Sequence, residues 1–204
     1  MKINEIFYSL QGEGYHTGRA GVFVRFSGCN LKCPFCDTDF HSYKEMGEEK
    51  IVEEILKADT GNSKFVIITG GEPTLQLTAT LITKLKREGY YVAIETNGCG
   101  KNPSKFGLDW ITISPKSPFL SGGKGVVLFP KCDEVKLVVD LDNITEETLT
   151  QFQKRIEAYR YYLQPCDTGN DKTNAKILDY TLWLLKQNPK WRLSLQTQKI
   201  LDIR

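Results

Sequence analysis

The stretch Cys29-Asn-Leu-Lys-Cys33-Pro-Phe-Cys36-Asp-Thr38 places three cysteines within eight residues, separated by three residues and then by two. Thiolates at such short spacing can hold one metal centre. A structural zinc site normally has four protein ligands, and a simple iron–sulfur carrier also uses four cysteines. Two interpretations are therefore open. One is a cubane whose fourth iron binds a non-protein ligand, and the other is a zinc site closed by Cys99, Cys132 or Cys166.

The size and composition of the chain are those of an ordinary globular domain. Its 204 residues are enough to form a sizeable hydrophobic core, and 40% of them are hydrophobic and 25% charged. The 27 basic residues exceed the 25 acidic ones by only two, so the net charge gives no reason to expect a nucleic-acid partner. We find no membrane-length apolar run and no signal peptide. Because three of the six cysteines are clustered, we expect a metal site in the reducing cytoplasm and not a disulfide framework.

Predicted strands and helices alternate along the chain. Strands are expected at 2–9, 20–26, 65–69, 91–95, 110–114, 135–139, 159–163 and 192–195. Helices are expected at 48–57, at 75–88, after Thr145 as N-cap, and at 174–187 with Ile177, Leu178, Leu182 and Leu185 facing inward. This order predicts an α/β fold with mostly parallel strands. Since the chain is short for a closed eight-stranded barrel, we expect an incomplete, partial TIM-type βα barrel, with a doubly wound open sheet as the alternative.

Polar or glycine-rich motifs follow four successive predicted strands. They are Gly70-Gly71-Glu72-Pro73, Glu95-Thr-Asn97-Gly98, Ser114-Pro115-Lys116 and Gln164-Pro165-Cys166-Asp167. Each motif alone is compatible with turn and capping chemistry, and a lone lysine is usually a solvated surface amine. In a βα barrel, however, the carboxyl ends of the strands converge on the active site. The repetition therefore predicts one shared site at that edge.

The cysteine spacing together with Gly-Gly-Glu-Pro resembles the radical S-adenosylmethionine (SAM) superfamily. Leu10-Gln11-Gly12-Glu13-Gly14, Arg25, Cys36-Asp37-Thr38, the strand-end motifs and Leu193-Ser-Leu-Gln-Thr-Gln198 resemble the 7-carboxy-7-deazaguanine synthase family over nearly the whole chain. The resemblance implies a single radical SAM domain spanning residues 1–204. It also implies a lyase that converts 6-carboxy-5,6,7,8-tetrahydropterin to 7-carboxy-7-deazaguanine by radical ring contraction with loss of ammonia, on the route to queuosine. The implied cofactors are a [4Fe-4S] cluster, regenerated SAM and Mg2+.

The resemblance also implies roles for individual residues. Cys29, Cys33 and Cys36 would ligate the cluster, and Thr38 would bind Mg2+ through its hydroxyl. The SAM site would comprise Phe35, Cys36, Asp37, Gly71, Glu72, Ser114, Pro115, Lys116, Gln164, Pro165, Cys166 and Asp167. The pterin would be held by Leu10, Gln11, Gly12, Arg25, Thr69 and Arg204. The family more often has histidine where this chain has Gln198, and its final residue varies.

The implied partners are the small pterin substrate and an electron donor such as flavodoxin or ferredoxin, with no nucleic acid and no membrane. A homodimer is also expected, because Tyr159, Tyr161 and Tyr162 together would present an aromatic face to a second copy. Two other functions stay open at this point. One is a different radical SAM enzyme, such as a glycyl-radical activase, and the other is a non-enzymatic zinc-binding module.

Overall fold

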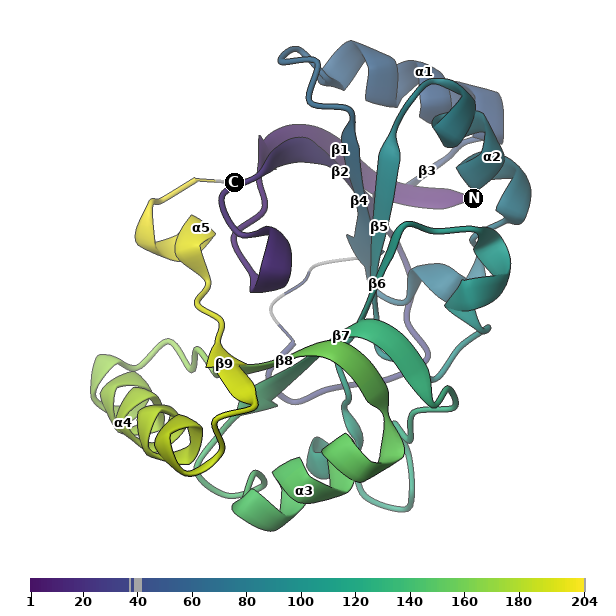
Figure 1. Ribbon diagram of the computed structural model, residues 1–204. Coiled ribbons are helices and arrows are strands. Elements are labelled where there is room, and N and C mark those ends of the chain that lie inside the picture. The colour runs from purple at the N-terminus through teal and green to yellow at the C-terminus, as the bar shows by residue number, and fades with distance from the viewer. Residues whose placement is uncertain (37, 39–41, 204) are drawn as a thin grey trace.

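A single curved sheet of nine strands runs through the molecule in the computed structural model, which describes residues 1–36, 38 and 42–203. The strand order is β3-β1-β2-β4-β5-β6-β7-β8-β9 (Figure 1). The strands are β1 Lys2–Leu10, β2 Ala20–Phe26, β3 Lys44–Glu45, β4 Phe65–Gly70, β5 Tyr91–Thr96, β6 Trp110–Ile113, β7 Lys131–Val139, β8 Glu157–Pro165 and β9 Trp191–Leu193. The helices are α1 Glu48–Ala58, α2 Ala79–Arg87, α3 Glu146–Arg155, α4 Asp171–Gln187 and α5 Thr197–Ile200.

The sheet confirms the incomplete barrel. Strand β2 and the six strands from β4 to β9 run parallel to one another, whereas β1 pairs antiparallel with both β2 and β3. From β4 to β9 the spatial order follows the chain order, without the reversal that defines a doubly wound sheet. Strands β3 and β9 form the two open edges of the described sheet.

Helices α1 to α4 cover the outer, convex face of the sheet (Figure 1). Alternate strand residues such as Val66, Ile68 and Ile94 pack there with Leu81 and Leu85 of α2 in the main core. The predicted N-cap at Thr145 is confirmed, because its hydroxyl accepts from the Thr148 amide while the Thr148 hydroxyl accepts from the Thr145 amide. Among the described residues, no helix combines the length and apolar character needed to span a bilayer.

Two predicted helices differ in detail from the observed ones. Helix α2 begins at Ala79 and not at Leu75, because a 3-10 turn at Pro73–Leu75 comes first and the Thr78 hydroxyl then caps the helix. Helix α4 begins at Asp171, three residues early, with Asn170 as its N-cap. The predicted inward positions Leu178 and Leu182 are wrong. These side chains are 37% and 36% exposed, and the buried stripe is Ile177, Thr181 and Leu184.

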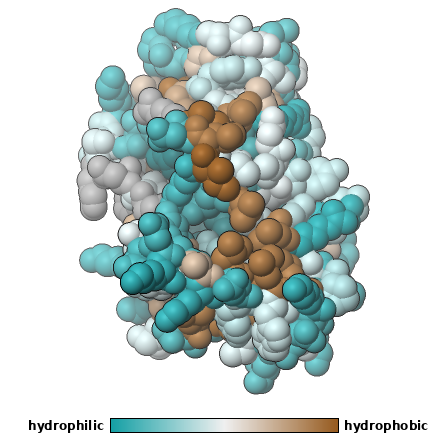
Figure 2. Space-filling model, turned by 90° about the vertical axis from the view of Figure 1, so that its left-hand side faces the viewer, coloured by the Kyte–Doolittle hydropathy of each residue, from teal (hydrophilic) through white to brown (hydrophobic). Residues whose placement is uncertain are grey.

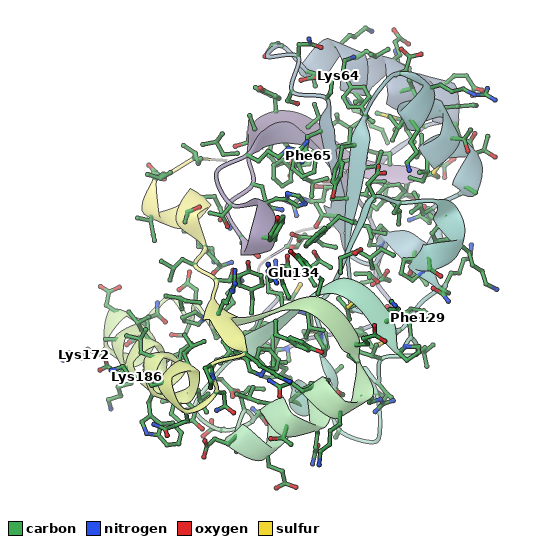
Figure 3. The ribbon with its side chains drawn as sticks, viewed as in Figure 1. Lys64, Phe65, Phe129, Glu134, Lys172 and Lys186 are labelled. Atoms are coloured by element: carbon green, nitrogen blue, oxygen red, sulfur yellow. The ribbon has the colours of Figure 1, made fainter. Side chains whose placement is uncertain are left out.

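Aromatic side chains close the amino end of the sheet's concave face. A short 3-10 turn at Gly14–His16 lies against it, with Tyr15 stacked on Trp110 at a centroid distance of 4.6 Å. The His16 ring lies 5.1 Å from that of Phe65, and burial together with Arg19 lowers the pKa of His16 to about 4. Figure 3 shows Phe65 of β4 and Glu134 of β7 inside the curve of the sheet. The open end is therefore the carboxyl end of the strands.

Candidate active site

A cavity of about 910 Å³ opens at the carboxyl ends of the parallel strands. Small-molecule sites occupy roughly 300–1,000 Å³, so this one is large. The structure brings most of the predicted site residues to its wall. These are Leu10, Gln11, Gly12, Arg25, Cys29, Cys33, Phe35, Cys36, Thr38, Thr69, Gly71, Ser114, Lys116, Gln164, Cys166 and Asp167.

Five predicted residues are not found on that wall. Asp37 and Arg204 lie outside the described residues. Pro115 and Pro165 do not line the cavity, and neither does Glu72, which is completely buried. The Glu72 carboxylate accepts hydrogen bonds from the Thr96 hydroxyl and the Asn97 amide, both at 2.7 Å. Its side chain therefore ties the turn after β4 to the end of β5, and a SAM contact at Glu72 stays a prediction for the backbone of the turn.

The glycines of the turn after β4 allow it to press against the start of the cysteine segment. The Gly71 amide donates to the Phe26 carbonyl at 3.0 Å, and the Glu72 amide donates to the Gly28 carbonyl at 2.9 Å. A Cβ on Gly71 would stand 2.1 Å from the Gly28 carbonyl oxygen, which no side chain can tolerate. Only glycine permits this close approach. The two strongest sequence motifs are thus in direct backbone contact.

The three clustered cysteines are free thiols beside the cavity. Cys29 and Cys33 are half-buried and Cys36 is exposed. Burial raises the pKa of Cys29 and of Cys33, and the nearby Lys116 ammonium opposes the effect at Cys33. A bound cation is what turns such thiols into thiolate ligands. Three free thiols on one loop, all bordering one cavity, fit a cubane whose remaining iron faces that cavity. Within the described residues, no three His, Cys, Asp or Glu side chains gather around a point that would suit a single ion.

Sequence reasoning missed a buried charge network in the floor of the cavity. The Lys136 side chain is 5% exposed, and its ammonium contacts the Glu13 carboxylate and, at 3.4 Å, Glu95 Oε1. Burial disfavours the charge on Lys136, but the surrounding carboxylates outweigh it and raise the pKa of Lys136; the pKa of Glu13 is correspondingly low. The signal was a lysine between Val135 and Leu137 in a buried strand, a position that needs a charged partner.

The C-terminal segment completes the wall by binding the loop after β1. Gln196 and Gln198 each donate through Nε2 to Glu13 Oε1 at 3.0 Å. The Thr197 amide donates to the Gly12 carbonyl at 3.1 Å. On the other side, the Lys199 ammonium lies 2.9 Å from Asp167 Oδ2. The tail thus joins the predicted pterin loop to the predicted SAM strand end.

Known proteins resemble this chain over its full length. The sequence profile of the Radical SAM superfamily matches residues 23–119. The 7-carboxy-7-deazaguanine synthase of Bacteroides thetaiotaomicron is 46% identical over 204 residues, covering 100% of this chain and 98% of the relative. The enzyme of the same name from Haemophilus influenzae is 41% identical, covering 100% and 94%. This chain belongs to the 7-carboxy-7-deazaguanine synthase family.

The fold comparison agrees with this family membership. The crystal structure of QueE from Escherichia coli superposes with a TM-score of 0.70 at 27% identity, covering 95% of this chain and 92% of that one. Membership in the radical SAM superfamily brings SAM and a [4Fe-4S] cluster as cofactors, which excludes the non-enzymatic zinc module.

Arg25 of this synthase lines the cavity and also pairs with an acid. Its Nε lies 2.8 Å from Glu5 Oε1, and both side chains are 24% exposed. The guanidinium carbon is 6.0 Å from the centre of the Phe7 ring. Glu5 and Phe7 hold the guanidinium at the cavity wall, where it can meet an anionic ligand group.

Proposed function

We propose that this enzyme converts 6-carboxy-5,6,7,8-tetrahydropterin to 7-carboxy-7-deazaguanine, contracting the ring with loss of ammonia and regenerating SAM. One observation carries the proposal. The cysteine loop, the glycine turn after β4 and the Leu10–Gly12 segment, each from a different strand end, line a single cavity in a member of this family.

The chain's own residues bind and orient the reactants. Cys29, Cys33 and Cys36 hold the cluster, and the turn at Gly71 together with Lys116 borders the position for SAM. The cluster supplies one electron and SAM supplies the group that removes a hydrogen atom from the substrate. The aromatic layer around Trp110 closes the opposite end of the concave face, which keeps water from entering there.

The substrate's charge and polarity match the remaining wall. Arg25 binds the pterin carboxylate, because a guanidinium offers paired donors to a carboxylate. Gln11 and Thr69 lie beside Glu95, to which Gln11 Nε2 donates at 3.1 Å. This polar group suits a fused ring that carries both donors and acceptors. Thr38 offers a hydroxyl oxygen on the same wall, and a hard cation such as Mg2+ prefers oxygen ligands.

The proposal extends to the whole chain, its compartment and its partners. One sheet spans residues 2–193, which supports a single radical SAM domain, and six free cysteines suit the reducing cytoplasm. A reduced carrier such as flavodoxin or ferredoxin supplies the electron.

The proposed homodimer needs a different surface from the one expected. Tyr162 is buried, and the Tyr161 hydroxyl donates to the Ile156 carbonyl, so only Tyr159 of the three is largely exposed. The aromatic face expected from residues 159–163 is therefore not formed. Figure 2 instead shows apolar side chains gathered on the side that carries α5 and β9. Leu195, Ile200, Leu201 and Ile203 are exposed in this part of the chain, which supports a contact there. Sedimentation of a monomer at micromolar concentration would remove this part of the proposal.

Anaerobic turnover tests the proposed reaction. The reconstituted enzyme is incubated with SAM, dithionite, Mg2+ and 6-carboxy-5,6,7,8-tetrahydropterin, and products are followed by mass spectrometry. We expect 7-carboxy-7-deazaguanine to form in large excess over any SAM consumed. SAM cleavage without this product would instead indicate another radical SAM reaction, such as glycyl-radical activation.

A further inference from the structure

The loops that follow β5 and β6 are strongly basic. Between Asn97 and Cys132 the chain has five lysines, at 101, 105, 116, 124 and 131, and one acidic residue, Asp109. Asp109 is paired with Lys86 at 2.8 Å and Lys131 with Glu157 at 3.1 Å, while Lys116 is only partly exposed and lines the cavity. The other three, Lys101, Lys105 and Lys124, are exposed, and none of them forms an ion pair within the described residues. We call Lys101, Lys105, Lys124 and the 63%-exposed Leu128 the basic loop surface.

The basic loop surface adjoins the cysteine loop. Asn30 Nδ2 donates to the Cys99 carbonyl at 3.2 Å, which joins the cysteine loop to the loop after β5. The Phe35 ring, between two of the cluster cysteines, lies 4.6 Å from the ring of Phe119 in the loop after β6. The two basic loops also meet each other, since the Leu128 amide donates to the Gly98 carbonyl at 2.9 Å. The loops that carry this surface are therefore in direct contact with the cysteine loop.

The opposite part of the same edge is acidic. The segments after β7 and β8, residues 140–143 and 166–171, contain no lysine or arginine and four aspartates, of which Asp167 is paired with Lys199 while Asp140, Asp142 and Asp171 have no lysine or arginine partner within the described residues. The edge that surrounds the cluster position is thus positive on the β5–β6 side and negative on the β7–β8 side. Such a separation of charge orients an approaching charged partner as well as attracting it.

We propose that the basic loop surface is the docking site for a small acidic one-electron carrier protein of the flavodoxin or ferredoxin kind. This inference rests on the proposed function, in which the cluster must be reduced. In the docked complex one electron passes from the reduced carrier to the oxidised cluster, and no bond is made or broken. The lysines attract the acidic partner, the β7–β8 aspartates repel it from the far side, and the exposed Leu128 offers a small apolar contact.

The test compares two ways of reducing the same enzyme. The variant K101E/K105E/K124E is assayed for turnover with dithionite and, separately, with a flavodoxin kept reduced by its NADPH-dependent reductase. The matched control is K172E/K186E/K190E, which makes the same change in net charge. Figure 3 shows Lys172 and Lys186 on α4, on the opposite side of the view from Phe129 of the loop before β7. All six lysines are exposed, and none lines the cavity.

We expect dithionite-driven turnover to be equal in wild type and both variants. Flavodoxin-driven kcat/KM for the carrier should fall at least about tenfold in K101E/K105E/K124E and stay within about twofold in the control, because steering charges change association rates by about 10- to 1,000-fold. The wild-type rate should also fall between 0.05 and 0.5 M salt, as screening shortens the Debye length, while the variant's rate should change little.

Several results would overturn the proposal. These are equal flavodoxin-driven rates in the two variants, no flavodoxin-driven turnover in a wild type that is active with dithionite, or loss of dithionite-driven turnover in K101E/K105E/K124E. If the lysines instead mediate binding of a transfer RNA while flavodoxin-driven turnover is intact, the surface is a nucleic-acid site and the proposal is wrong. Absence of the deazaguanine product with dithionite in wild type would refute the proposed function itself, and this inference with it.

Discussion

Replacing Lys136 with methionine is expected to destabilise the protein far more than the same change at Lys131, although both lysines belong to β7. The Lys136 side chain is 5% exposed and forms an ion pair with Glu13, which is 14% exposed. The Lys131 side chain is 74% exposed and pairs with an equally exposed Glu157. K136M leaves the Glu13 carboxylate buried against neutral amides, whereas K131M returns Glu157 to water.

The expected losses in the free energy of unfolding depend on how deeply each ion pair is buried. Removing one partner of a buried ion pair costs about 3–5 kcal/mol, because the other charge stays buried. An exposed pair contributes about 0–1 kcal/mol. For a chain of this length, 1 kcal/mol changes Tm by about 2–4 °C, so K136M should lower Tm by about 6–20 °C and K131M by less than about 4 °C.

The Tm of each variant is measured by anaerobic thermal unfolding followed by circular dichroism, on protein samples with equal iron content. The double variant E13Q/K136M removes both charges and should be more stable than K136M alone, with a coupling of about 0.5–3 kcal/mol. Equal losses in K136M and K131M, or a double variant no better than K136M, would refute the description of a buried, mutually stabilising pair.

Three further substitutions test other parts of the structure. Burial raises the pKa of Glu134 from 4.5 to about 7, so the folded state keeps a proton that the unfolded state releases, and stability must fall as pH rises between those values. E134Q should remove most of that fall, up to about 3 kcal/mol, and an unchanged pH profile of Tm would contradict the assignment. R25Q should lower kcat/KM for the pterin by about 10- to 100-fold, because it removes a hydrogen bond between two charged groups, and KM for SAM should stay unchanged. A rise in KM for SAM alone would show that Arg25 does not bind the pterin carboxylate. G71A, whose Cβ would meet the Gly28 carbonyl oxygen at 2.1 Å, should bind less than half the wild-type iron, whereas G47A, whose Cβ would only touch Glu49 Oε2 at 4.0 Å, should bind the full amount.

The sequence predicts well where short spacing or local alternation carries the information. The expected strand at residues 20–26 coincides with β2, because its β-branched and aromatic residues stop at Ser27-Gly28. The motifs at the strand ends share one cavity, since the carboxyl ends of parallel strands converge regardless of the details of each loop.

Contacts between distant residues are what the sequence leaves undetermined. Lys136 and Glu13 are 123 positions apart, and nothing local in either segment identifies its partner. The sequence also does not show the partners of Glu72. Its motif is typical of a ligand-binding turn, but the Thr96 hydroxyl and the Asn97 amide at the end of the next strand donate hydrogen bonds to its carboxylate. In α4 the leucines point to two faces, and the buried face includes Thr181, which can be buried because its hydroxyl donates to the Ile177 carbonyl of the same helix at 2.7 Å.

Electron paramagnetic resonance of the anaerobically reconstituted, reduced protein tests most directly whether Cys29, Cys33 and Cys36 hold a cluster with one open iron. We predict a reduced [4Fe-4S] signal whose shape changes when SAM is added, and loss of that signal when any one of the three cysteines is replaced by serine. A colourless protein with one zinc ion bound by four side chains, or a cluster signal that SAM leaves unaltered, would contradict the assignment.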